Sequence, residues 1–449
     1  MQQHCPQRLL AQLENLLQLP PSAEVTAQLL EFQRDPGALF VVLPMLLQSS
    51  GLQAQLFLAR SMERLLTRFL GAYDAEKIAI LQEQLLLWLV SKQGHPAVAS
   101  LVGIVLAKCM RANFHSEQSS ALVPRLFGER PEISLPILRS LISEFCRLEP
   151  RWSRGRNRLS LAFLRDQFME SILEYAKNQV MQGVHAEAAL LLAEALTFDW
   201  RGNFDPKEDM PVPIPRSATL RRVVFGNNCA LVRALVVRAQ SEGEWQHACL
   251  QSLRNIARLH RPFLSQDAPI LLDHLIDGVI VLAGKSENLQ LLQFCVEIKR
   301  TFRLQEIVDT GRLVALCQCI APLSVSTFTM EGDVTNVALE LWAAFAEALP
   351  MLEDKDAGMH LLKVVSQLGQ SYVMTRTSRG CPCHHCAQDG GDVPDCRYSE
   401  SLGRILAADI CHSLRLLASL LSDQSGSVSA CARAFVVAVS GTLLCLPLV

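Results

Sequence analysis

The sequence predicts an all-α protein, and three observations carry this prediction. Leucines and other apolar residues recur at helical spacing through most of the chain, which is the pattern of amphipathic helices. Strict alternation of apolar and polar residues, which is typical of half-buried strands, is almost absent. Short polar breaks rich in Pro, Gly and Ser separate the helical segments, so successive helices are expected to form hairpins.

Six helices are predicted in the first quarter of the chain. The first carries Leu9, Leu13 and Leu16 on one face. It ends before Pro20 and Pro21, because proline cannot continue a helix. The other five have their apolar stripes over residues 25–32, 39–47, 56–69, 78–89 and 98–109.

The helical pattern continues beyond residue 130, with three irregular interruptions. Segment 149–158 is rich in arginine, segment 199–216 contains the run PKEDMPVPIPRS, and segment 375–398 is rich in Gly, Cys and His. We expect these three segments to be long loops between helices. Helices are predicted over residues 135–148, 159–180, 186–196, 219–239, 244–259, 269–283, 289–301, 311–320, 334–349 and 356–373.

The spacing of the helices suggests a repeat architecture. First helices of successive pairs begin near residues 8, 37 and 77, so one pair takes roughly 30–40 residues, the range of helical solenoid repeats. The period is irregular, and the signatures of tetratricopeptide and ankyrin repeats are missing. The predicted fold is therefore a right-handed α-solenoid of HEAT-type helical hairpin repeats, and a compact helical bundle is the alternative.

Composition excludes several classes of function. The chain has 449 residues, of which 50% are hydrophobic, and a formal net charge of -2. We predict no nucleic-acid partner, because nucleic-acid binding needs a clustered basic surface. No polybasic membrane signal is present, and the first 18 residues resemble an amphipathic helix rather than a signal peptide. The 15 cysteines are odd in number and lie in apolar runs, which indicates a reducing, intracellular location.

The stretch ALTFDWRGNFD at residues 195–205 concentrates aromatic and acidic residues in a chain that is otherwise poor in aromatics. We interpret Phe198, Trp200 and Phe204 as a hydrophobic plug at the end of a helix pair, with Asp199 capping or bracing the turn. The alternative is an anchor for a bound protein, because tryptophan is enriched at binding hot spots.

This stretch also carries a family resemblance. The run HAEAALLLAEALTFDWRGNFD, followed by acidic residues and PVPIPRS, resembles exportin-7-like nuclear transport receptors of the importin-β superfamily. Upstream, AQLLEFQRDPGALFVVLPMLLQSS and QAQLFLARSMERLLTRF are similar to the amino-terminal block of that superfamily. Downstream, LLDHLIDGVIVLAG, LELWAAFAEALPML and SYVMTRT follow in the family's order, so the resemblance covers residues 8–376. Its matching positions are Phe32, Pro36, Gln55, Ala59, Leu196, Phe198, Asp199, Trp200, Pro215, Ser217, Phe294 and Cys295, with Arg216 as an insertion.

The resemblance implies a nuclear export receptor. Such a receptor binds the small GTPase Ran in its GTP form and a protein cargo cooperatively. It shuttles between nucleus and cytoplasm through the nuclear pore by weak contacts with Phe-Gly nucleoporins. The Ran-binding part would be residues 1–115, chiefly the helices over 53–69 and 96–110. A HEAT-repeat scaffold or adaptor protein outside the Ran cycle is the alternative.

The resemblance also suggests a division of the chain. Residues 1–115 would be the Ran-binding repeats and residues 116–374 further repeats of the exportin solenoid. Segment 375–400 would be a Cys/His/Gly-rich loop, and 401–449 would be terminal helices with an aberrant end. Because receptors of this class have much longer chains, we expect the sequence to represent an amino-terminal portion.

The run CPCHHC at residues 381–386 is the strongest candidate for metal chemistry. Cys383 and Cys386 have the C-x-x-C spacing of one half of a zinc site, and Cys396 is a candidate third ligand. Other possible ligands are Cys381, His384, His385, Cys411 and His412. A second C-x-x-C pair is missing, and we predict an exposed loop without metal.

No motif indicates catalysis. The sequence lacks G-x-S-x-G, G-x-x-x-x-G-K-[ST] and H-E-x-x-H, so we predict a non-enzyme without cofactors. A zinc-dependent enzyme built on the Cys/His loop is a remote alternative. The arginine cluster in and beside segment 149–158, Arg147, Arg151, Arg154, Arg156 and Arg158, is expected to lie in a solvated loop or to meet an acidic partner. The apolar tail 435–449 is short for a membrane span and is expected to be buried or disordered, with a membrane tail anchor as the alternative.

Overall fold

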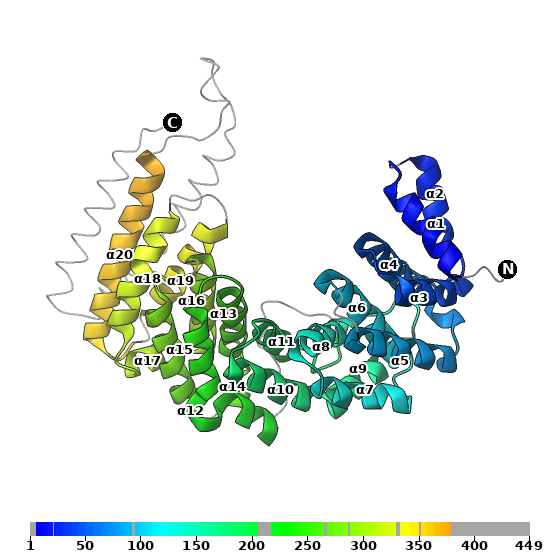
Figure 1. Ribbon diagram of the computed structural model, residues 1–449. Coiled ribbons are helices and arrows are strands. Elements are labelled where there is room, and N and C mark those ends of the chain that lie inside the picture. Colours follow the sequence, from blue (N-terminus) through cyan, green and yellow to red (C-terminus); the bar gives the residue numbers. More distant parts are fainter. Residues whose placement is uncertain are drawn as a thin grey trace, which may run out of the picture. The chain divides into compact units, whose positions relative to one another are not determined.

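The structure, a computed structural model, describes residues 6–20, 22–91, 95–204, 217–264, 267–285, 288–328, 333–349 and 352–378. These residues form α-helices with a few short 3-10 helices and contain no β-strand (Figure 1). The prediction of an all-α fold is therefore confirmed for the described part of the chain. The chain divides into two compact units, Met1–Gly226 and Asn227–Val449.

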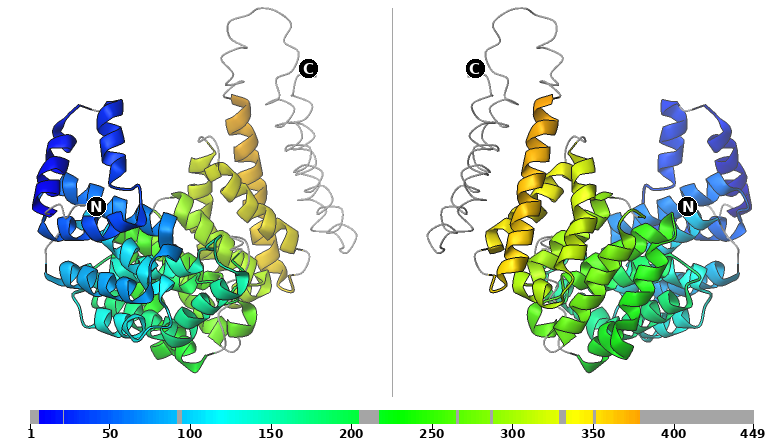
Figure 2. Two further views of the ribbon diagram at one scale, coloured as in Figure 1. Left: turned by 90° about the vertical axis from the view of Figure 1, so that its right-hand side faces the viewer. Right: turned by 90° about the vertical axis from the view of Figure 1, so that its left-hand side faces the viewer.

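The helices of the first unit pack in two rows. Helices α4, α6, α8 and α11 lie side by side in one row, and α5, α7 and α10 pack against it (Figures 1 and 2). Consecutive helices therefore pair, and successive pairs stack on one another. The helices are α1 (Pro6–Gln18), α2 (Ala23–Glu31), α3 (Leu39–Gln48), α4 (Leu52–Phe69), α5 (Ala75–Ser91), α6 (Pro96–Ala112), α7 (Glu117–Phe127), α8 (Pro131–Cys146), α9 (Arg154–Gln167), α10 (Met169–Gln182) and α11 (Glu187–Leu196).

Local signals set the ends of these helices. The hydroxyls of Ser116 and Ser153 accept hydrogen bonds from backbone N–H groups in the first turns of α7 and α9, which satisfies donors that have no partner inside the helix. Pro96 and Pro131 occupy the first positions of α6 and α8, where their missing N–H costs nothing. Gly183 ends α10 with a left-handed backbone, φ 71°.

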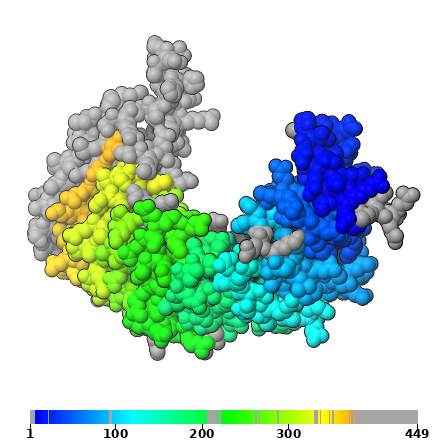
Figure 3. Space-filling model, in the orientation of Figure 1, coloured from blue at the N-terminus to red at the C-terminus, as the bar shows by residue number. Residues whose placement is uncertain are grey.

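Helix α6 is the centre of the first unit. It is packed by α4, α5 and α8, and Val102, Val105 and Leu106 are fully buried. At Gly103 a Cβ atom would lie 3.4 Å from Cγ1 of Ile137 on α8, so the glycine permits a close approach of the two helices. Figure 3 shows the outer surface of the first unit in the colours of Figure 1.

The second unit repeats the two-row arrangement. Helices α13, α16 and α19 form one row, and α15, α18 and α20 form the other (Figure 2). The division between the units falls within α12, where three consecutive residues, Asn227, Asn228 and Cys229, have positive φ angles of 53°, 54° and 54°. The helices are α12 (Ala218–Ala239), α13 (Glu244–Ala257), α14 (Arg261–Leu264), α15 (Ala268–Leu282), α16 (Asn288–Thr301), α17 (Leu304–Asp309), α18 (Leu313–Thr327), α19 (Asp333–Ala348) and α20 (Lys355–Ser378).

A buried carboxylate connects the row of α13, α16 and α19. Glu297 on α16 is 4% exposed. The guanidinium of Arg300 approaches its Oε1 at 3.4 Å, and those of Arg254 and Arg258 lie 3.8 Å from the carboxylate. Burial nevertheless raises the pKa of Glu297, because these long contacts do not fully replace the lost hydration. Arg300 also binds Glu340 on α19, so charge links three successive helices.

The structure corrects several predicted boundaries. Residues 159–180 are not one helix: α9 ends at Gln167, and Phe168 leaves helical geometry with φ -129° and ψ -24°. The ring of Phe168 packs edge-on against Phe163 at 5.5 Å, so burial of this side chain accompanies the break.

Helices α7, α14 and α17 lie where none was predicted. Helix α9 begins at Arg154, inside the predicted loop 149–158, and α20 reaches Ser378, inside the predicted loop 375–398.

A pair of glycine substitutions in the second unit tests the packing of α12 against α15. A Cβ atom on Gly278 would lie 2.8 Å from Cγ2 of Val236, whose β-branched side chain is stiff. We expect Gly278→Ala to lower the free energy of unfolding by about 1–2 kcal/mol through overpacking. At Gly369 on α20 a Cβ atom would meet nothing within 4 Å, so Gly369→Ala should raise stability by about 0.5–1 kcal/mol through helix propensity. Thermal and urea unfolding of both variants measure the difference, and equal stabilisation by the two would refute the close approach.

Candidate functional site

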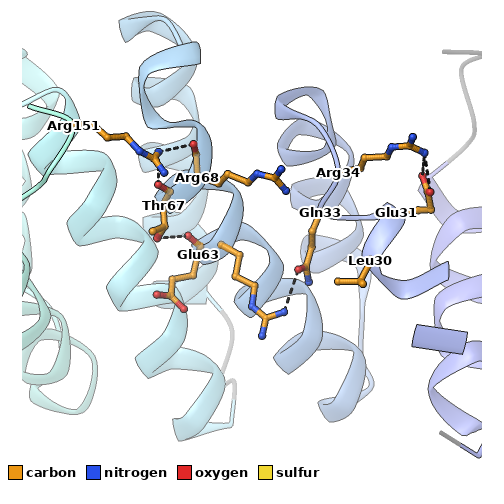
Figure 4. Close-up of a pocket in the computed structure, with 9 residues that line it drawn as sticks. Leu30, Glu31, Gln33, Arg34, Glu63, Thr67, Arg68 and Arg151 are labelled. Carbon is orange, nitrogen blue, oxygen red and sulfur yellow. Dashed lines mark hydrogen bonds and ion pairs between the residues drawn. The ribbon is translucent and has the colours of Figure 1, made fainter. Parts of the chain in front are cut away.

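An open groove of about 720 Å³ lies between the end of α2 and the second half of α4 (Figure 4). Its basic residues are Arg34, Arg64, Arg68 and Arg151, and its acidic residues are Glu31 and Glu63. Leu30, Gln33 and Thr67 complete the lining. All of these residues belong to the first unit.

Helix α4 supplies one wall because its two faces differ. Leu58, Leu65 and Leu66 face the core and are at most 1% exposed. Arg64 and Arg68 are four residues apart and exposed, so they lie one above the other on the opposite side. In Figure 4, Arg68 extends from α4 into the groove.

Arg151 reaches the groove from the linker between α8 and α9. Its Nη1 donates a hydrogen bond to the carbonyl oxygen of Thr67 at 2.7 Å, and a second to that of Arg68. These are carbonyl groups of the last turn of α4, which have no partner inside the helix. A cation at this end also interacts favourably with the helix dipole. Arg151 therefore caps α4 and adds its positive charge to the groove.

The linker that carries Arg151 is fixed by Asn157. This side chain is fully buried. Its Oδ1 accepts a hydrogen bond from the backbone N–H of Glu149 at 2.9 Å, and its Nδ2 donates to the carbonyl of Glu149 at 3.0 Å. A buried amide with its donors and acceptor satisfied by the backbone rigidifies the segment around it.

Arg111 on α6 also fixes this linker, and its side chain is only 2% exposed. Its Nη2 donates to Oδ1 of Asn157 at 2.8 Å and to the carbonyl of Arg147. Its Nη1 donates to the carbonyl of Glu144 at 2.7 Å and contacts the Glu144 carboxylate at 3.3 Å. Burial lowers the pKa of Arg111, and the charge of Glu144 works against that shift. The guanidinium is thus a structural node between α6, α8 and the linker.

The charges of the groove are unevenly paired. Arg34 forms an ion pair with Glu31 at 2.9 Å, and Arg64 donates to Oε1 of Gln33 at 3.1 Å. Arg68 lies 5.0 Å above the ring of Phe69, within the range of a cation–π interaction, and has no carboxylate partner among the residues that the structure describes.

The predicted arginine cluster at 147–158 does not act as a unit. Arg151 caps α4, while Arg154, Arg156 and Arg158 lie in α9. The guanidinium of Arg156 lies 4.3 Å from the ring centre of Trp152. The expected solvated loop is therefore limited to residues 147–153. Sequence reasoning missed the groove, although the spacing of Arg60, Arg64 and Arg68 along one helix face was a visible signal.

The predicted structural plug at 198–204 is confirmed for two of its three aromatics. Phe198 and Trp200 are buried and pack edge to face with ring centres 5.4 Å apart. Phe204 is half-buried. Asp199 braces the turn, since its carboxylate accepts hydrogen bonds from the backbone N–H groups of Gly202, Asn203 and Phe204 at 2.8, 3.2 and 2.7 Å. Burial of the rings argues against a role as an exposed protein anchor. Pro215, at the far end of this segment, lies outside the described residues.

The candidate metal ligands cannot be placed. Cys383, Cys386 and Cys396, like the rest of 379–449, lie outside the described residues. Within the described ranges no group of three or more His, Cys, Asp and Glu side chains is arranged to hold a metal ion. Burial raises the pKa of the thiols of Cys146, Cys249 and Cys317 to about 12, so these groups are protonated near neutral pH and are poor nucleophiles.

Comparison with known proteins gives no assignment: no protein-family model matches the sequence, and no curated protein matches it. Among the helices that the structure describes, none combines the length and the apolar character needed to cross a membrane.

The plug supplies a direct test of the turn after α11. Asp199→Ala removes the acceptor of three backbone N–H groups, two of them in half-buried positions. We expect the free energy of unfolding to fall by about 2 kcal/mol, because charge-assisted hydrogen bonds are lost and the donors are left unsatisfied. Asp166→Ala is the matched control, because among the described residues the contact of the Asp166 carboxylate is an exposed pair with its neighbour Arg165, and such a pair is worth little. Equal midpoints of urea unfolding for the two variants would contradict the bracing role.

Proposed function

We propose that this protein is a nuclear transport receptor built as a right-handed α-solenoid of HEAT-type repeats. In this proposal it binds Ran in its GTP form through residues 1–115 and carries a protein cargo. The support comes from the sequence blocks described above and from the stacking of helix pairs in two rows. A repeat architecture of this kind offers an extended surface to a protein partner rather than an enclosed pocket for a small substrate.

The exposed face of α4 is the observation that carries the proposal. Residues 53–69 were expected to contact Ran, and Gln53, Arg60, Arg64 and Thr67 of this segment are exposed along one face of α4, with the half-buried Phe57 between the first two. The second expected segment, 96–110, corresponds to α6, which is buried on most sides and exposes Pro96, Ala97 and Ser100. The proposed Ran surface therefore centres on α4, and α6 supports it from behind.

Binding of Ran and cargo would be coupled through the stack. In a repeat protein each pair of helices contacts chiefly its neighbours, so a partner on one surface can change the curvature that another partner meets. Thermodynamic linkage makes this coupling reciprocal: if Ran strengthens cargo binding, cargo strengthens Ran binding by the same factor. Hydrolysis of GTP on Ran would then weaken the binding of both. In the same proposal, Phe-Gly nucleoporins bind weakly to the outer surface during passage through the nuclear pore.

A binding assay checks the proposal. The protein is immobilised, and its affinity is measured for Ran loaded with a non-hydrolysable GTP analogue and for Ran loaded with GDP. We expect binding to the GTP form that is at least about tenfold tighter, a difference of about 1.4 kcal/mol. The double variant Gln53→Glu/Arg60→Glu should weaken that binding by about tenfold. It introduces two negative charges into the proposed contact surface, and charges that are not complementary to the partner weaken binding.

Arg158→Glu, which changes an exposed arginine of α9, serves as the control and should bind Ran as the unchanged protein does. Binding that ignores the nucleotide would exclude the transport proposal and support a scaffold outside the Ran cycle. Nucleotide-dependent binding that survives the double variant would move the contact away from α4.

A further inference from the structure

The groove beside α4 holds more positive than negative charge. Four arginines and two glutamates line it, which leaves a net charge of +2. One arginine is neutralised locally, because Arg34 and Glu31 form an ion pair. The guanidiniums of Arg64, Arg68 and Arg151 have no carboxylate within ion-pair distance among the described residues.

Two of these three cations are held in place before any partner arrives. Arg151 is tied by hydrogen bonds to the end of α4, and its linker is fixed by the buried Asn157. Arg64 donates to Gln33, whose amide in turn donates to the buried hydroxyl of Ser61 at 2.9 Å. Side chains that are already ordered lose less conformational entropy on binding, so the groove is preorganised for a negatively charged partner.

We propose that this groove binds an acidic peptide segment of a partner protein. Guanidinium groups pair with carboxylates through paired, charge-assisted hydrogen bonds. Arg68 extends into the groove from α4, between Arg151 and the Glu31–Arg34 pair (Figure 4). It is the central contact in this arrangement.

Three features select a peptide over a nucleic acid. Glu31 and Glu63 lie in the lining itself and would repel the unbroken run of phosphates of a nucleic-acid strand. A peptide can instead place its carboxylates opposite the arginines and uncharged residues opposite the glutamates. Leu30 is 53% exposed at the edge of the groove, so an apolar side chain of the same peptide can cover it. The chain as a whole carries a charge of -2, which adds no general attraction for polyanions.

The groove shares Arg64 and Thr67 with the proposed Ran surface. The inference nevertheless goes beyond the proposed transport function, because the groove would bind the peptide without Ran or cargo. The test uses the full chain and a fluorescein-labelled peptide of repeated Glu-Glu-Leu triplets, followed by fluorescence anisotropy. Saturable binding is expected, and it should weaken as the salt concentration rises from about 50 to about 200 mM, because screening weakens exposed charge pairs. The corresponding Gln-Gln-Leu peptide should not bind.

Substitutions locate the site. Arg68→Glu should weaken peptide binding by at least about tenfold. Its side chain is exposed and its only described contact is with the ring of Phe69, so the variant is expected to fold. Arg158→Glu makes the same change of charge on α9, outside the groove, and should leave the affinity within about twofold, as expected for a distant exposed charge.

Three outcomes would overturn the inference. They are equal weakening by the two variants, equal binding of the Glu and Gln peptides, or an Arg68-dependent affinity for single-stranded DNA that exceeds the affinity for the peptide. Circular dichroism and the unfolding midpoint of Arg68→Glu confirm that a loss of binding reports on the groove and not on the fold. Because neither Ran nor nucleotide is present in this assay, its result is separate from the result of the Ran experiment.

Discussion

The first unit depends on the hydrogen bonds and the ion pair of the buried Arg111 guanidinium. This group is almost fully buried and joins α6 to the end of α8 and to the linker that follows. A buried charge is costly unless hydrogen bonds and an opposite charge replace its hydration. Here carbonyl groups, the Asn157 amide and the Glu144 carboxylate provide them. Lys108 lies 3.3 Å from the same carboxylate, so a single acidic side chain balances two cations, and removal of Glu144 would leave both uncompensated.

The position of the candidate groove follows from this node. Arg111 and Asn157 fix the linker, the linker positions Arg151, and Arg151 caps the last turn of α4. Thus α4, α6, α8 and the linker form one connected unit, although Arg151 and Thr67 are 84 residues apart in the chain. The cations of the groove consequently rest on packed elements, where positioning is more precise than on a free loop.

Charge also connects helices elsewhere, with different degrees of burial. Between α8 and α11, Arg139 bridges Glu187 and Glu194, the second at 2.6 Å. In the second unit, three arginines surround Glu297 at longer distances, and burial prevails over their charge in setting its pKa. The apolar core supplies most of the stabilisation in such a stack, because hydrophobic burial is the dominant favourable contribution to folding. The ion pairs fix which helix surfaces face one another, and this alignment determines which polar residues are left on the outer faces for a partner.

The sequence by itself determined that the described chain is helical, because the 3.6-residue period of leucines and the Ser, Pro and Gly signals at helix ends act over a few neighbouring residues. It also identified the buried plug at Phe198 and Trp200 and the brace formed by Asp199, since all three lie in one short stretch. Local patterns could not place the break at Phe168, because apolar spacing continues through it and the burial of its ring against Phe163 depends on the packing of α9. Only the tertiary structure decided that Arg111 is a buried node, that α6 is covered on most sides, and that Arg151 joins Arg64 and Arg68. Each of these depends on contacts between residues far apart in the chain, for which an arginine in the sequence gives no sign of its partner.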